Sequence, residues 1–95
     1  MIGKYCIVRT YSAGVFAGIV KYRKGQEVEL TNARRIWYWS GAASLSQLAN
    51  EGTSDPDNCK FPAAVKSVTL LQAIEIIPVT SKGQKSIESV KEWRK

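Results

Sequence analysis

The fold class is decided by the stretch Lys4-Tyr5-Cys6-Ile7-Val8-Arg9-Thr10-Tyr11. Successive side chains of a β-strand point to opposite faces of the sheet. The alternation therefore puts Tyr5, Ile7, Arg9 and Tyr11 on one face and Cys6, Val8 and Thr10 on the other. Because β-branched and aromatic residues dominate both sets, the stretch is predicted to be a strand.

The residues that follow predict two further strands joined by turns. Residues 12–14 are small turn formers, and residues 15–22 read as a second strand in which Gly18 marks a bend or a close backbone approach. Residues 23–26 form the next turn, and residues 27–31 alternate as a third strand. The first two strands are expected to pair as an antiparallel hairpin.

An aromatic segment continues this pattern. Asn32 and Ala33 are predicted to interrupt the third strand, and residues 34–39 to resume as a further strand. In such a strand Trp37 and Trp39 point the same way. The first forty residues therefore look like a meander of three or four strands.

Two helices are predicted from capping signals. Ser44 and Gln47 match a capping box, with a short helix to about Glu51 that Gly52 ends. Residues 53–62 contain two X-Pro pairs and read as a loop. Residues 65–79 form a second apolar block, in which residues 74–77 are a strand that Pro78 ends.

The second helix is expected to begin at Ser81, with Gln84 as its capping-box partner, and to run to about Lys91. Ile87 and Val90 would face the sheet. Gly83 is expected to weaken this helix by roughly 1 kcal/mol relative to alanine. Together these signals predict a single α+β domain over residues 1–95. It contains a small antiparallel sheet or partly open barrel of about five to six strands, a short central helix and a C-terminal helix.

The composition argues against ordinary enzyme chemistry. The chain has no histidine, the commonest general base and catalytic zinc ligand. Its carboxylates are scattered, and its glycines fit no phosphate-loop spacing. Two cysteines, Cys6 and Cys59, are too few for a disulfide scaffold and are expected to be reduced core residues. We therefore expect a binding protein with no catalytic residue, no metal and no cofactor.

The charge favours an anionic partner. The formal net charge is +6, and the first acidic residue is Glu27. Such an excess attracts nucleic acid, nucleotides or acidic protein surfaces, although it also keeps a small domain soluble. The longest uncharged stretch, residues 36–50, is too short and polar to span a bilayer. The N-terminus lacks signal-peptide features, so we expect cytoplasmic location, no membrane partner and, given the small core, a homo-oligomer.

Residues 34–44 carry the richest candidate site. Arg34 and Arg35 supply guanidinium groups for phosphate, and Trp37, Tyr38 or Trp39 supply rings on which a base stacks. Ser44 begins a helix whose free amides attract an anion. Arg9 and Tyr11 join this surface if the first strand pairs near residues 34–39. The alternative is that the tryptophans fill the core and the arginines are solvated or ion-paired.

Several stretches resemble a family of small uncharacterised proteins encoded by tailed phages and prophages. The resemblance is carried by residues 8–18, 32–49, 58–62 and 73–78. It implies a phage origin and action in the cytoplasm of the infected bacterial host. Small accessory phage proteins are often counter-defence factors, and one class resembles oligomeric sponges that sequester cyclic nucleotide signals. The leading expectation is therefore a non-enzymatic counter-defence protein that sequesters a phosphorylated, cyclic nucleotide.

Two alternatives stay open. The first is DNA or RNA binding through the cations of the N-terminal hairpin, Lys4, Arg9, Lys21, Arg23 and Lys24. The second is inhibition of a host enzyme or defence factor by a surface rich in tryptophan, tyrosine and arginine, the residues that dominate protein interfaces.

Overall fold

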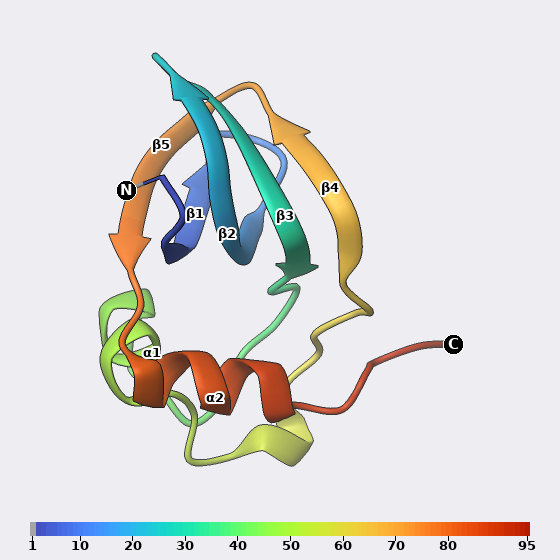
Figure 1. Cartoon of the computed structure of the whole chain (residues 1–95). Helices are drawn as coiled ribbons and strands as arrows, with labels where there is room; N and C mark the ends of the chain where they lie inside the picture. The colour runs from blue at the N-terminus through green and yellow to red at the C-terminus, as the bar shows by residue number, and fades with distance from the viewer. Residues whose placement is uncertain (1) are drawn as a thin grey trace.

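A computed structural model describes residues 2–95 of the chain. The elements are, in order, β1 (Tyr5–Thr10), β2 (Val15–Lys24), β3 (Glu27–Arg35), α1 (Leu45–Glu51), the 3-10 helix η1 (Pro56–Asn58), β4 (Val65–Leu70), β5 (Ala73–Pro78) and α2 (Ser81–Ser89). The predicted α+β class is confirmed: the fold is an open five-stranded antiparallel sheet with two helices (Figure 1).

The sheet is strongly curved, and the chain connectivity requires this. Its strand order is β4-β3-β2-β1-β5, so the two edge strands are consecutive in the sequence. Only Leu71 and Gln72 join them. In a flat sheet the edges would lie roughly 19 Å apart, whereas three Cα–Cα steps span at most about 11 Å. The sheet therefore curls until β4 and β5 meet at one end (Figure 1).

The curvature creates two apolar cores that share β1. Cys6 and Val8 point into a cluster that the curved strands enclose themselves, together with Phe16, Val20, Val28, Leu30, Ala33, Leu70 and Ala73. Tyr5 and Ile7 point the other way. They join Ala17, Ile36, Leu48, Ala49, Cys59, Phe61, Ile87 and Val90, so this second core lies between the sheet and the helices. The predicted alternation of β1 is confirmed, and both of its faces are buried.

The helices lie against each other at one end of the sheet (Figure 1). The first begins as predicted, because the Ser44 hydroxyl accepts a hydrogen bond from the Gln47 amide at 3.2 Å. The Gln47 side chain accepts from the Ala43 amide rather than that of Ser44. Gly52 ends the helix as predicted, with φ +79°.

The second helix differs from its prediction in both ends. Its N-cap is Thr80, whose hydroxyl accepts from the Gly83 amide at 3.0 Å, whereas the capping box predicted Ser81 as the cap; Ser81 is instead the first helical residue. It ends at Ser89 rather than Lys91. Thr80 also donates to Asn50 O at 2.8 Å, so a contact with α1 selects the cap. Ile87 and Val90 are buried as predicted.

The aromatic segment is not the strand that its alternation predicted. The third strand continues through Asn32, which has φ +50°, and ends at Arg35. A register shift opposite Gly18 marks a β-bulge, where an added Cβ would lie 2.9 Å from Thr31 O. The predicted interruption is thus a bulge, and the predicted close approach at Gly18 is confirmed. Beyond it, Tyr38 makes only an isolated bridge to Lys60.

The long loop after this segment is ordered by its own polar contacts. The Thr53 hydroxyl donates to Ser40 O, and the Ser40 hydroxyl donates to Asp55 at 3.0 Å. Gly41, with φ +81°, lies against the backbone of Ser54 and Asp55, where a Cβ would not fit. The loop therefore holds residues 40–41 in place. Within residues 2–95, no helix is long and apolar enough to cross a membrane.

Gly83 generates a stability prediction. Helix propensity alone favours alanine at this position, but an added Cβ would overlap the backbone oxygen of Ala49 at the α1–α2 contact. We expect Gly83→Ala to lower the free energy of unfolding by about 1–3 kcal/mol, the usual cost of overpacking. Urea unfolding measures this. Lys85→Ala, at an exposed position of the same helix, should change stability by less than about 0.5 kcal/mol. A more stable Gly83→Ala variant would contradict the close packing.

Candidate functional site

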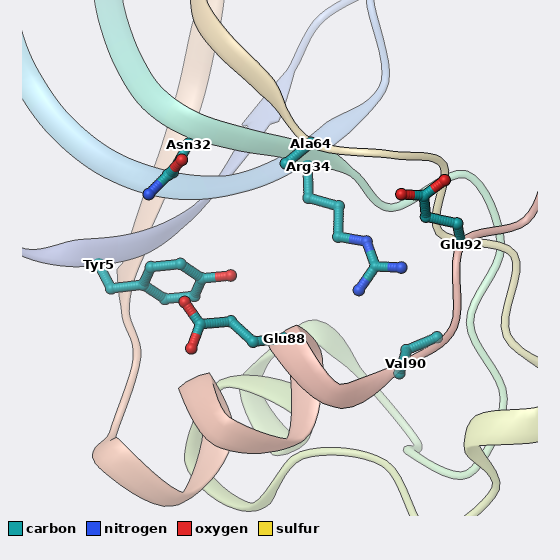
Figure 2. Close-up of a pocket in the computed structure, with 7 residues that line it drawn as sticks. All are labelled: Tyr5, Asn32, Arg34, Ala64, Glu88, Val90 and Glu92. Atoms are coloured by element: carbon teal, nitrogen blue, oxygen red, sulfur yellow. The ribbon is translucent and has the colours of Figure 1, made fainter.

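Arg34 lies inside the molecule rather than on a phosphate-binding surface. Figure 2 shows its side chain pointing into a pocket, and only 7% of the residue is exposed. Its guanidinium donates to three backbone oxygens. The acceptors are Pro62 O at 3.0 Å, Phe61 O at 3.0 Å and Ile87 O at 2.8 Å. The last lies in the final turn of α2, where the helix dipole favours a cation. Burial lowers the pKa of Arg34.

Arg35 is exposed but already engaged. Its Nη1 donates to Ala13 O at 2.6 Å, and its guanidinium lies 4.3 Å from the centroid of the Phe16 ring. These contacts tie the end of β3 to the β1–β2 turn. Part of the group still faces solvent, so Arg35 retains donors for a ligand.

Trp39 and Ser44 have local structural partners. The Trp39 indole donates to Ala42 O at 3.1 Å and packs against the core beside the helices. Ser44 uses its hydroxyl as the N-cap of a helix of seven residues. The core-packing alternative therefore describes Trp39, and Ser44 acts as a helix cap.

Trp37 and Tyr38 instead face solvent, with 59% and 50% of their side chains exposed. The Trp37 ring stacks on Trp93, with ring centroids 5.3 Å apart and planes 21° from parallel. The Lys60 ammonium lies 5.5, 5.8 and 5.6 Å from the centroids of Trp37, Tyr38 and Trp93. Lys95 approaches the other tryptophan of the pair, 6.0 Å from the Trp93 ring. We call these five residues the aromatic–basic surface.

Three chain segments build this surface through backbone hydrogen bonds. The amides of Trp37 and Tyr38 donate to Lys60 O at 3.2 and 3.3 Å, and the Lys60 amide donates back to Tyr38 O at 2.8 Å. The Trp93 amide donates to Phe61 O at 3.0 Å. Phe61, with no exposed side-chain surface, anchors the middle segment in the core. The rings thus project from a fixed backbone.

A cavity of about 330 Å³ continues this surface. It is lined by Ser12, Ala13, Gly14, Val15, Arg35, Ile36, Trp37 and Trp39. Three predicted site residues, Arg35, Trp37 and Trp39, therefore share one cavity. Tyr38 lies beside it, whereas Arg34 lines a different cavity.

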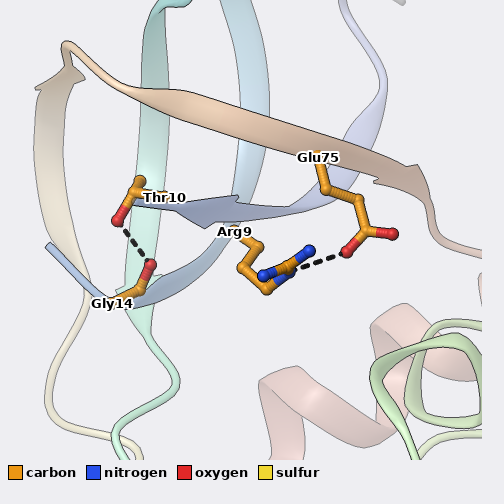
Figure 3. Close-up of polar contacts among 4 residues, drawn as sticks. All are labelled: Arg9, Thr10, Gly14 and Glu75. Atoms are coloured by element: carbon orange, nitrogen blue, oxygen red, sulfur yellow. Dashed lines mark hydrogen bonds and ion pairs between the residues drawn. The ribbon is translucent and has the colours of Figure 1, made fainter. Parts of the chain in front are cut away.

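Arg9 and Tyr11 do not belong to this surface. β1 pairs with β2 and β5, so β2 separates Arg9 from Arg35. The Arg9 Nε donates to Glu75 at 2.9 Å, an exposed ion pair across β1 and β5 (Figure 3). Beside it, the Thr10 hydroxyl donates to Gly14 O at 2.8 Å and closes the turn. Tyr11 is exposed in this turn, and its amide donates to Gln72 O.

The aromatic–basic surface and its cavity lie within a chain whose family is recognisable. The family model described as "Domain of unknown function (DUF6948)" matches residues 3–87. The chain belongs to this family. No curated protein and no solved structure matches it. The DUF6948 description assigns no activity, so the predicted phage origin stays a prediction.

This DUF6948 member holds its two thiols apart. Cys6 and Cys59 are free and buried in different cores, and burial raises the pKa of the Cys6 thiol. Among residues 2–95, no group of three or more His, Cys, Asp or Glu side chains could hold a metal ion.

Lys60 and Trp93 were not among the predicted site residues. Trp93 lies in a short segment with Lys91, Arg94 and Lys95, a mixture of ring and cations that signals an anionic ligand. Lys60 gives no such signal, because its position among three rings arises from the pairing of its backbone with that of Tyr38. Of these two residues, only Trp93 could therefore have been recognised from the sequence.

Tyr5, which lines the Arg34 cavity, generates a prediction about pH. Burial, and then the charge of Glu88, raises its pKa from 10.0 to about 12. The folded state thus keeps this proton while the unfolded chain loses it, so stability falls as pH rises from 10 to about 12. We expect Tyr5→Phe to lose less unfolding free energy over that range than the natural chain. Tyr22→Phe, at an exposed position, is the control, and equal losses in all three proteins would refute the prediction.

Proposed function

We propose that this chain is a non-enzymatic protein that binds single-stranded nucleic acid on the aromatic–basic surface. The observation that carries the proposal is the stack of exposed Trp37 on half-buried Trp93, with Lys60 among the rings. Stacking platforms with adjacent cations bind successive bases and the phosphates between them. Each stacked base contributes about 1–3 kcal/mol.

The openness of the surface favours a polymer. A cavity site for a small ligand buries roughly 70–90% of that ligand. Half or more of the Trp37 and Tyr38 side chains is exposed, and each presents ring surface to solvent. Arg34, the expected phosphate fork, is buried away from this surface and lines a different cavity. A single-stranded nucleic acid that makes several moderate contacts suits such an open surface better than a single nucleotide, which needs an enclosed site.

The charges of the N-terminal hairpin support this choice of surface. Arg9 is paired with Glu75, and the Lys21 ammonium lies 4.0 Å from Glu29. The Arg23 Nε donates to Gly25 O at 3.1 Å. Two of the five hairpin cations are thus ion-paired, and paired cations release fewer counterions on binding a phosphate chain. Lys60 and Lys95 instead lie against aromatic rings, which leaves their charge available to a phosphate.

A free nucleotide is the second candidate ligand. The cavity that Arg35, Trp37 and Trp39 share favours it, because a guanidinium and two indoles converge there. This is the sequestration role expected from the sequence, with Arg35 in place of Arg34 as the phosphate partner. The counter-defence setting stays a prediction that depends on the resemblance to phage proteins.

Fluorescence anisotropy with a labelled single-stranded oligonucleotide tests the proposal. We expect micromolar binding at low salt that weakens about 20-fold between about 50 and 200 mM salt, if three phosphates are contacted. Trp37→Ala should weaken binding roughly 5- to 150-fold, the loss of one stacked base. Tyr22→Ala, at an exposed tyrosine on β2, should bind as the natural chain does.

Two outcomes would overturn the proposal. One is a dissociation constant weaker than about 100 µM at low salt. The other is binding that Trp37→Ala leaves unchanged.

Paired charge reversals distinguish the aromatic–basic surface from the N-terminal hairpin as the binding surface. Lys95→Glu should weaken binding and Lys24→Glu should not, whereas the opposite result assigns binding to the hairpin. Titration with cyclic dinucleotides, in competition with the oligonucleotide, tests the second candidate.

A further inference from the structure

The cavity beside Arg34 has a composition that the proposed function does not use. Its volume is about 350 Å³, and it is lined by Tyr5, Asn32, Arg34, Ala64, Glu88, Val90 and Glu92 (Figure 2). These residues come from β1, β3, the segment before β4, α2 and the C-terminal segment. The cavity therefore depends on the complete tertiary fold.

Arg34 is a buried cation without a carboxylate partner. Within residues 2–95, no carboxylate oxygen lies within 4.0 Å of its guanidinium. A guanidinium carries five N–H donors, and backbone oxygens take three of them. Two donors are thus free in a side chain that lines the cavity. Buried charges are normally paired, so this arrangement suits an anionic group from outside the chain.

Two carboxylates line the same cavity, and neither forms an ion pair with Arg34. Figure 2 shows the guanidinium between Glu88, on α2, and Glu92, on the C-terminal segment. The formal charges of these three side chains sum to −1. A ligand with only a negative charge would be repelled by the two glutamates, and a ligand with only a positive charge would be repelled by Arg34. A molecule that carries both charges satisfies all three groups.

The size of the cavity limits that molecule. Ligand cavities range from roughly 300 to 1,000 Å³, so 350 Å³ lies near the lower end. Val90, Ala64 and the Tyr5 ring add apolar surface for a small side chain. We propose that this cavity binds a free α-amino acid, whose carboxylate accepts from Arg34 and whose ammonium lies between Glu88 and Glu92.

This site is independent of nucleic-acid binding, because none of its lining residues belongs to the aromatic–basic surface. The competing explanation is purely structural. Arg34 joins β3 to Phe61, Pro62 and the last turn of α2 in any case, and both glutamates are exposed enough to be solvated. Ligand measurements separate these two explanations.

Isothermal titration of the full chain against each of the common amino acids tests the proposal, with propionate and ethylamine as single-charge probes. We expect at least one amino acid to bind with a millimolar or tighter dissociation constant. Each single-charge probe should bind at least about 10-fold more weakly, because it loses one charge-assisted contact. No binding below about 10 mM by any amino acid, or equal binding of propionate and alanine, would overturn the proposal.

Variants at the glutamates locate the site without disturbing the fold. Glu88→Gln and Glu92→Gln should each weaken amino-acid binding roughly 10-fold. Glu51→Gln, at an exposed position of α1, should leave it unchanged. Unchanged binding in both glutamine variants would place the ligand elsewhere and refute this site. Oligonucleotide binding by Glu88→Gln should match the natural chain, so the two proposals fail separately.

Discussion

The two-residue link between β4 and β5 is the constraint on which the rest of the structure depends. Leu71 and Gln72 join opposite edges of a five-stranded sheet. Two residues can span the distance between β4 and β5 only if the sheet curls. Curling encloses one core within the strands and leaves the outer face of β1 to a second core under the helices. A chain of 95 residues thereby gains two apolar clusters from one sheet, although a small domain buries a limited share of its surface.

Arg34 connects that scaffold to both candidate sites. Its three hydrogen bonds join β3 to the backbone at Phe61 and Pro62 and to the end of α2. Phe61 O also accepts from the Trp93 amide, so the same carbonyl fixes one ring of the aromatic–basic surface. Arg34 also lines the cavity that contains Glu88 and Glu92. One guanidinium thus contributes to both candidate sites.

Much of the local structure could be predicted from the sequence, and the candidate site only in part. The alternation of β1, the turn at Gly25 and the cap at Ser44 depend on neighbouring residues, and they were predicted. The strand expected through Trp39 was wrong, because beyond Arg35 the backbone makes one hydrogen bond to β2, from the Ile36 amide to Val15 O, and then pairs with residue 60 only as an isolated bridge. Gly83 looked unfavourable by helix propensity, but contact with Ala49 requires it.

The sequence by itself determined the fold class, the net charge and the concentration of arginines and rings in residues 34–39, since these depend on residue types and short-range periodicity. Only the tertiary structure decided that Arg34 turns inward, that Trp37 and Tyr38 face solvent, and that Lys60 and Trp93 complete their surface. The physical reason is distance along the chain. Residues 37, 60 and 93 meet through backbone bridges and core packing at Phe61, and no local pattern encodes a contact of that range.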